Sequence, residues 1–431
     1  MMNTNRDKDI LVKRALEEIT KISRDTFSQV HVTKLPESEG RYRAYPGELD
    51  PAVISVMKDK GIEELYSHQA EAIELVLKKR NVVVATPTAS GKTLVYNSVT
   101  LNALNRNPAS KSLYLFPTKA LAQDQLSELL ELNKLLGDKI GLFTNDGDTP
   151  QSTRKAIRKQ AQIVISNPYM LHSGILPHHT KWINLFENLE YIIIDELHSY
   201  TGVFGSHMAN VMRRLKRICE FYGSKPTFIM SSATISNPKE LAEMITSEVV
   251  ELVDQSGAPR GEKYLVFFNP PVVNKQLGIR RSYLSVARQV SHILLKNQLQ
   301  IITFANTRLY TEILVKYLKS DFEKKVTEAG QIRGYRGGYL PKKRREIEKG
   351  LRNGDIKAVV STNALELGID IGALDGVVLA GYPGSIASTW QRLGRAGRRS
   401  GSSIGILVSS STPVNQFILI TRNIFQKGLR K

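Results

Sequence analysis

A loop suited to binding phosphate is the clearest chemical pattern in this sequence. The apolar run 82–85 leads into residues 86–91 (Thr-Pro-Thr-Ala-Ser-Gly), and Lys92, Thr93 and a helix-like stretch follow. A strand, a loop and a helix in this order favour anion binding, because the N–H groups at a helix start are unpaired. We expect Lys92 to neutralise the β and γ phosphates of ATP and Thr93 to bind Mg²⁺. The loop residues expected around the phosphates are Thr88, Ala89, Ser90 and Gly91, and Thr86 stands where such loops usually have a glycine.

Two adjacent carboxylates follow a second apolar run, residues 191–194 (Tyr-Ile-Ile-Ile). Asp195 and Glu196 would lie at the C-terminal end of a buried strand, where open α/β sheets bind ligands. This position suits Asp195 for contact with Mg²⁺ and Glu196 for orienting and deprotonating an attacking water. A pair of solvated loop acids is the alternative, and a phosphate loop in the same domain makes that alternative the weaker one.

Arginines alternate with glycines near the end of the chain, over residues 391–399 (Gln-Arg-Leu-Gly-Arg-Ala-Gly-Arg-Arg). Glycines weaken a helix, so a solvated helical face does not explain this pattern. Arginine carries a planar, permanently charged group suited to stabilising a transferring phosphoryl group. If Arg395 and Arg398 reach the nucleotide from a second domain, hydrolysis requires the cleft between the domains to close.

Short apolar runs that alternate with amphipathic stretches would position these groups. The runs fall into two series, 82–85, 112–116, 162–166, 191–194 and 227–231, then 265–268, 300–304, 357–361, 376–380 and 405–408. Apolar strands between helices predict parallel sheets covered on both faces, and so two tandem α/β domains. We place them at 51–254 and 255–431, with turn formers at 254–262 as the link and residues 1–50 as an N-terminal extension that begins with a helix near 10–23.

Charge and composition limit the class of protein. Lysine and arginine number 60 against 41 aspartates and glutamates, which gives a net charge of +19. A polyanionic partner is expected, with a merely basic enzyme as the alternative. The single cysteine, Cys219, excludes an intramolecular disulfide and a cysteine-cluster metal site, and we expect a buried structural thiol. Without a signal peptide or a membrane-length apolar run, the expected location is the cytoplasm, at the nucleoid in a bacterial cell.

Eight blocks in order resemble the motifs of the superfamily-two DExH-box helicases. They are residues 65–72, which include Gln69, then 86–93, 117–123, 195–198, 232–234, 304–308, 361–370 and 391–398. The blocks 65–69, 145–149, 166–172, 335–341 and 363–372 are similar to the RecQ-four-related subgroup with mitomycin repair factor A (YprA-type). The resemblance implies two RecA-like P-loop domains and a 3′-to-5′ DNA translocase that acts in repair, with ATP and Mg²⁺ as cofactors.

The resemblance also implies roles for single residues. Gln69 would read adenine, Asp370 would lie near the ribose, and Arg395 with Arg398 would be arginine fingers. Relay between nucleotide and nucleic acid is expected from His198, Ser232, Thr234 and Gln391, although a packed histidine is the alternative at His198.

A motor that moves along any sequence needs phosphate contacts rather than base readout. The candidates are Thr118, Asn167, Arg308, Arg336, Gly337 and Thr362, and ordinary loop polarity is their alternative. The basic run 342–345 is interpreted as a solvated face that adds non-specific attraction to phosphates.

The subgroup carries a four-cysteine module beyond the helicase core, and a chain with only Cys219 does not contain it. We interpret the sequence as a truncated core or a natural short version, expected to be a monomer. A two-domain core can translocate without the wedge that splits a duplex, so unwinding is left open. DNA is favoured as the partner, with an RNA helicase or a non-catalytic ATP-gated clamp as the alternatives.

Overall fold

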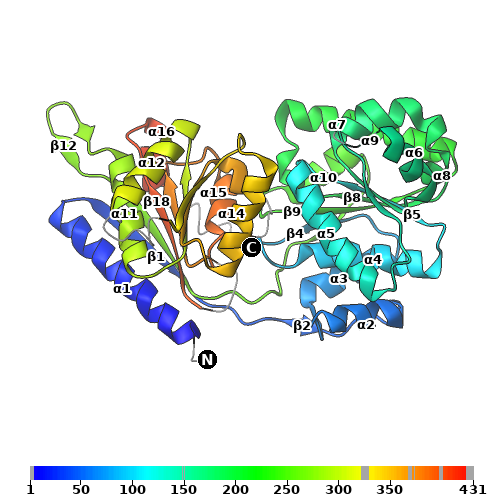
Figure 1. The fold of residues 1–431 in the computed structure, drawn as a ribbon, viewed down its shortest axis with the longest axis horizontal. Helices are drawn as coiled ribbons and strands as arrows, with labels where there is room; N and C mark the ends of the chain where they lie inside the picture. The colour runs from blue at the N-terminus through cyan, green and yellow to red at the C-terminus, as the bar shows by residue number, and fades with distance from the viewer. Residues whose placement is uncertain are drawn as a thin grey trace. The chain divides into compact units, whose positions relative to one another are not determined.

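The chain forms two α/β units in a computed structural model that describes residues 4–147, 149, 151–321, 330–366, 371–372, 374–397 and 401–423 (Figure 1). The first unit comprises residues 40–258. The second unit combines residues up to 39 with those from 259 onward. Both units therefore depart from the predicted boundaries, most clearly at the N-terminus.

A seven-stranded parallel sheet in the order β10-β4-β9-β8-β5-β7-β6 forms the centre of the first unit. Its strands are β4 (Val82–Ala85), β5 (Lys111–Leu115), β6 (Leu142–Thr144), β7 (Ile163–Ser166), β8 (Leu189–Ile194), β9 (Thr227–Ser232) and β10 (Glu251–Val253). The inner strands β4, β5, β7 and β9 are buried at every position, because helices cover both faces of the sheet.

The helices of the first unit connect these strands. They are α2 (Pro51–Asp59), α3 (Ser67–Leu77), α4 (Lys92–Arg106), α5 (Lys119–Leu135), α6 (Gln151–Gln160), α7 (Pro168–Met170), α8 (Ile183–Glu187), α9 (Gly202–Phe221) and α10 (Pro238–Thr246). Shorter turns are η1 (Leu171–Ile175), η2 (Leu176–Lys181) and η3 (Leu197–Ser199), and β2 (Tyr42–Arg43) pairs with β3 (Leu65–Tyr66). Cys219 is buried in the apolar core beside this sheet, as expected of a structural thiol.

The second unit has a seven-stranded sheet in the order β1-β11-β18-β17-β14-β16-β15, parallel except at β1. Its strands are β1 (Gln29–Leu35), β11 (Lys263–Asn269), β14 (Ile301–Ala305), β15 (Ile332–Tyr335), β16 (Ala358–Ser361), β17 (Gly376–Ala380) and β18 (Ser403–Val408), with a hairpin of β12 (Val272–Asn274) and β13 (Ile279–Arg280). The helices are α1 (Thr4–Asp25), α11 (Tyr283–Lys296), α12 (Arg308–Asp321), α14 (Pro341–Asn353), α15 (Ile386–Leu393) and α16 (Pro413–Ile420), with the turn η4 (Asn363–Leu365). The predicted α/β class is confirmed.

The N-terminal segment is the main correction to the predicted organisation. The sequence predicts a separate extension over residues 1–50, but α1 and β1 are built into the second unit. Strand β1 pairs antiparallel with β11, and α1 buries Val12, Ala15 and Ile19 in the same core as β11 and β18. The Ser402 N–H also bonds Asp9 at 2.6 Å. A local sequence pattern predicts a helix in this segment, but it does not identify the strand or core, hundreds of residues away, against which the segment packs.

In the part of the chain that the structure describes, no helix has both the length and the apolar character needed to cross a membrane.

Candidate functional site

The predicted phosphate loop connects the end of β4 to the start of α4. Ala89 and Gly91 have φ values of 63° and 74°, so the loop turns sharply before Lys92 begins the helix. The Thr86 and Ser90 hydroxyls lie 2.6 Å apart, and both side chains are buried. This hydrogen bond joins the two ends of the loop, so the threonine that replaces the usual glycine stabilises the loop conformation. Lys92 Nζ lies 2.8 Å from Thr86 O and 2.9 Å from Pro87 O, so the ammonium lies against the loop.

Helix α3 holds the other side of the loop. The Gln69 side-chain amide donates to Gly91 O at 2.8 Å and accepts the Tyr66 N–H at 2.9 Å. A primary amide has two N–H groups and two lone pairs, so capacity for a base edge is left. Adenine recognition by Gln69 stays a prediction, whereas its support of the loop is a structural feature.

The predicted acidic pair lies at the same sheet edge. Asp195 follows β8, which pairs with β9, and β9 pairs with β4, so the phosphate loop and Asp195 follow strands separated by one neighbour. Asp195 accepts the Glu196 N–H at 2.9 Å and also bonds the Ser231 hydroxyl. Glu196 has a left-handed φ of 51°, a strained conformation for a non-glycine residue. Such strain is common at functional sites.

Burial and the neighbouring Glu196 charge raise the pKa of Asp195 to about 7, although its bond to the Glu196 N–H and the Lys92 charge act in the opposite direction. A carboxylate in this setting is stabilised by a further cation. The residues described include no cluster of three His, Cys, Asp or Glu side chains that could hold a metal. Mg²⁺ is commonly held by one or two carboxylates together with substrate phosphates, so Asp195 and Thr93 are donors of the right chemistry.

Two buried tyrosines near this pair were missed by the sequence reasoning. The Tyr96 hydroxyl lies 3.4 Å from both Thr93 Oγ1 and Gln125 Oε1, and it acts to lower the pKa of Asp195. Tyr200 is fully buried, and burial together with the Asp195 and Glu196 charges raises its pKa well above the usual range. Tyr96 follows Thr93 by one helical turn, a spacing that places both on one face of α4 and could have identified it.

Of the predicted relay residues, His198 contacts the segment 232–234 through a main-chain N–H group. The Ala233 N–H donates to His198 Nδ1 at 3.1 Å, and Glu196 Oε2 lies 3.5 Å from the same nitrogen. Because Nδ1 accepts a hydrogen bond, the contact with Glu196 is not an ion pair in this state. The contact from β9 to His198 therefore runs through Ala233, between the predicted Ser232 and Thr234. Relay by Ser232 and Thr234 stays a prediction.

In the second unit, the predicted Arg395 and the nearby Arg392 contact the turn after β16. Arg392 pairs with the Glu366 carboxylate at 2.8 Å, and Arg395 donates to Glu366 O at 2.6 Å. Arg395 is 1% exposed and Gln391 is also buried, so in this conformation Arg395 bonds within its own unit. A finger role for Arg395 stays a prediction that requires it to move. Arg398 and Asp370 lie outside the described residues.

The predicted nucleic-acid contacts follow strand ends in both units. Thr118 caps α5 after β5, and Asn167 caps α7 after the adjacent strand β7. In the second unit Thr362 caps η4 after β16, and the strands beside β16 lead to the exposed Arg308 and to Arg336, with Gly337 also exposed. Arg336 forms an ion pair with Glu312 at 2.8 Å. Helix starts at one sheet edge favour phosphate contacts, so the arrangement is compatible with the predicted track.

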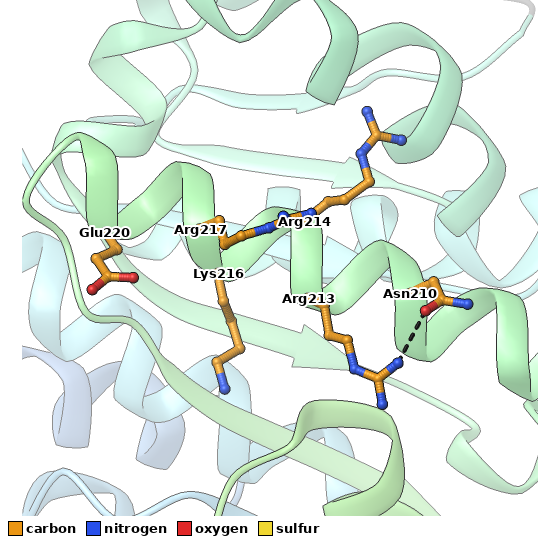
Figure 2. Close-up of a pocket in the computed structure, with 6 residues that line it drawn as sticks. All are labelled: Asn210, Arg213, Arg214, Lys216, Arg217 and Glu220. Atoms are coloured by element: carbon orange, nitrogen blue, oxygen red, sulfur yellow. Dashed lines mark hydrogen bonds between the residues drawn. The ribbon is translucent and has the colours of Figure 1, made fainter.

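A shallow hollow of about 620 Å³ lies on α9, apart from the phosphate loop. Figure 2 shows its side chains fanning out from the helix, with Arg213 bonded to Asn210 at 3.0 Å. The lining residues are Asn210, Arg213, Arg214, Lys216, Arg217 and Glu220. Four cations against one carboxylate make this surface strongly basic, and Arg214 bonds His172 at 2.9 Å, which joins it to the block 166–172.

Comparison with known proteins gives the family. A DEAD/DEAH box helicase model matches residues 66–241, and a helicase conserved C-terminal domain model matches residues 285–400. The ATP-dependent helicase YprA of Bacillus subtilis is 53% identical over 407 residues, which cover 94% of this chain and 54% of that protein. The ATP-dependent helicase HRQ1 of Saccharomyces cerevisiae is 40% identical over 401 residues, which cover 90% of this chain and 36% of that protein.

Solved structures agree with these relatives. The DUF1998 helicase MrfA bound to DNA and AMPPNP is 52% identical with a TM-score of 0.90, covering 95% of this chain and 57% of that one. Dbp5 of S. cerevisiae, at 19% identity and a TM-score of 0.66, shows the fold alone. The chain spans about half the length or less of the relatives YprA and HRQ1. It belongs to the superfamily-two DEAD/DEAH-box helicases, and within them it is similar to YprA, HRQ1 and MrfA.

Proposed function

We propose that this chain is the motor core of an ATP-dependent DNA helicase or translocase. The observation that carries the proposal is the meeting of the phosphate loop, Asp195 and Glu196 at one sheet edge of the first unit. The similarity to MrfA, which was solved with DNA and AMPPNP, supports both ligands. We further infer 3′-to-5′ movement on single-stranded DNA, a role in repair, a monomeric state and a cytoplasmic location.

The chemistry assigned to the first unit is phosphoryl transfer to water. The loop N–H groups and Lys92 bind the phosphates and orient the γ-phosphoryl group. Thr93 and Asp195 are the residues that would hold Mg²⁺, which, when bound, supplies charge that offsets the phosphate oxygens. Glu196 orients the attacking water and takes its proton. Its left-handed backbone conformation sets the direction in which the side chain leaves the main chain.

Nucleic acid is assigned to the strand-end residues of each unit and to the basic surface on α9. Thr118 and Asn167 cap the helices that follow the adjacent strands β5 and β7. The N–H groups and polar side chains at these helix starts can donate hydrogen bonds to phosphate oxygens. The α9 surface is joined to this region by the bond between Arg214 and His172 and adds sequence-independent attraction. Contacts of this kind suit a motor that must pass any base.

The test is ATP turnover with and without single-stranded DNA and a matched RNA. Stimulation by DNA is expected, and Glu196→Gln should lower stimulated turnover at least about a hundredfold because the water loses its base. Greater stimulation by RNA would favour an RNA helicase. Turnover that does not change with any nucleic acid, or with Glu196→Gln, would instead favour a non-catalytic clamp and end the proposal.

A further inference from the structure

His68 is a buried residue of α3 that contacts two separate segments of main chain. Its Nε2 lies 3.0 Å from Ser90 O in the phosphate loop, and its Nδ1 accepts the Gly257 N–H at 3.1 Å. The side chain is fully buried in the first unit. Because Nδ1 is an acceptor, the proton is on Nε2, which donates to Ser90 O. A single neutral ring therefore connects the phosphate loop to the segment that leaves the first unit.

The loop carbonyls held by α3 belong to the peptide groups that matter for phosphate binding. A peptide group is planar, so Ser90 C=O turns together with the Gly91 N–H, and Gly91 C=O turns with the Lys92 N–H. His68 holds the first of these planes and Gln69 holds the second. Any rotation of these N–H groups toward a phosphate must therefore move, or be resisted by, the first turn of α3.

The other end of the connection is equally constrained. The Gly257 C=O accepts the Arg41 N–H at 2.8 Å, and the Ser67 N–H donates to Arg41 O at 2.8 Å. A Cβ on Gly257 would lie 2.3 Å from Ser67 Oγ and 2.8 Å from Arg41 O. Only glycine fits this close approach. Gly257 is thus fixed to α3 two residues before the chain passes into the second unit at Pro259.

We propose that His68 is a positioning residue that links the state of the phosphate loop to Gly257, at the start of the passage into the second unit. Nucleotide binding at residues 88–93 changes the peptide planes that His68 holds, and the rigid imidazole passes the displacement to Gly257. The proposal rests on the proposed function, since it needs a nucleotide at the loop. It explains why a buried histidine, rather than an apolar side chain, lies beside Gln69.

Two substitutions separate the two bonds. The glutamine amide nitrogen is as many bonds from Cβ as Nε2, so His68→Gln keeps the donor to Ser90 O and removes the acceptor for Gly257. The asparagine oxygen is as many bonds from Cβ as Nδ1, so His68→Asn keeps the Gly257 bond and removes the Ser90 bond. For His68→Gln we expect an unchanged KM for ATP and about a tenfold lower DNA-stimulated kcat, the size of one buried hydrogen bond or slightly more. For His68→Asn we expect the KM to rise by a similar factor.

Amide hydrogen exchange gives a second measurement, whose first readout needs only the unaltered protein. In the unaltered protein, AMPPNP with Mg²⁺ should slow amide hydrogen exchange in peptides that cover 86–93 and in peptides that cover 254–260. His68→Gln should retain the first protection and lose the second. Gly257→Ala should lower the stimulated kcat without changing the KM for ATP, because its Cβ meets Ser67 and Arg41 and displaces the N–H that His68 accepts. In the double variant with His68→Gln, the loss should be smaller than the sum of the two single losses. Gly47→Ala is the control, because a Cβ there meets nothing within 4 Å.

The outcomes separate the inference from the proposed function. Absence of AMPPNP protection at 86–93 would show that the loop does not bind nucleotide and would refute the proposed function. Protection at 86–93 without protection at 254–260 would overturn the role of His68. Equal kcat and KM in His68→Gln and the unaltered protein would overturn it as well.

Discussion

Acid should destabilise the first unit through His68, because only the neutral ring makes both of its bonds. Burial lowers the His68 pKa to about 4 from 6.5, and the charges of Lys92 and Arg41 act in the same direction, whereas the bond to Ser90 O opposes them. The folded pKa lies below the unfolded one, so the unfolded chain binds the proton first as the pH falls. The stabilisation is present above pH 6.5 and is lost between pH 6.5 and pH 4.

The size of the effect follows from the shift. At about 1.4 kcal/mol per pKa unit, a shift from 6.5 to about 4 corresponds to roughly 3 kcal/mol in total. At pH 5 the histidine is protonated in the unfolded chain but still mostly neutral in the folded protein. Protonation of the unfolded chain therefore lowers the free energy of unfolding by about 2 kcal/mol at this pH. The glutamine in His68→Gln does not titrate. Between about pH 8 and pH 5, the free energy of unfolding should therefore fall by about 2 kcal/mol more in the unaltered protein than in this variant.

Urea unfolding followed by tryptophan fluorescence measures this difference. The chain has two tryptophans, and Trp182 is buried in the core of the first unit. In a Trp390→Phe background the fluorescence therefore reports the first unit alone. Carboxylates elsewhere titrate in both proteins and cancel in the comparison. The same loss of unfolding free energy in both proteins would refute the assigned tautomer and its two bonds.

Three further predictions concern other parts of the molecule. Ile19→Ala should destabilise the second unit by about 2–5 kcal/mol, measured by Trp390 fluorescence in a Trp182→Phe background, because Ile19 is fully buried in its core; an unchanged midpoint would contradict the placement of α1. In a plot of log affinity for DNA against log salt concentration, Arg217→Ala should make the slope shallower by about one, whereas Lys58→Ala, at an exposed position on α2, should leave the slope unchanged. Equal slopes in the two variants would exclude α9 from the interface. Tyr96→Phe should raise the Mg²⁺ concentration for half-maximal turnover several-fold, since the buried hydrogen bond from Tyr96 to Thr93 Oγ1, an expected Mg²⁺ ligand, is lost, and an unchanged requirement would show that Tyr96 does not support the metal site.

The inner strands and the family could be predicted from the sequence because their signals are local. Runs such as 82–85 and 191–194 are apolar at successive positions, and the chemical motifs follow them directly. The strands β6, β10 and β15 escaped the prediction because they are short or lie at or next to a sheet edge, where burial imposes less of a pattern. Strand β1 escaped because its pairing with β11 depends on residues far along the chain.

The positions of the candidate residues were predicted best where one residue type has one chemical use, and their roles stay predictions. Lys92 and Thr93 follow β4, and Asp195 and Glu196 follow β8, so both pairs lie beyond strand ends at one sheet edge, with β9 between the two strands. Partners that act through hydroxyl or ring nitrogen contacts, such as Ser231 and His68, carry no distinctive spacing and were not identified, whereas the helical spacing of Tyr96 from Thr93 was available but not used. Their roles depend on which strands are neighbours, and β4, β9 and β8 are adjacent in the sheet although not in the sequence.

In the second unit, one predicted nucleic-acid contact and one predicted arginine finger belong to or contact the same short turn. The turn after β16 starts with Thr362, a predicted nucleic-acid contact, and ends at Glu366, whose carboxylate binds Arg392 and whose carbonyl accepts from Arg395. Arg395 is buried and donates to Glu366 O, so it would leave this turn at little cost only where another acceptor replaces that carbonyl. A γ-phosphoryl group is such an acceptor, and displacement of the turn by a strand bound at Thr362 would weaken the bond that competes with it. If both predicted roles hold, nucleic acid should promote hydrolysis without touching the nucleotide, and the turnover assay detects this as stimulation.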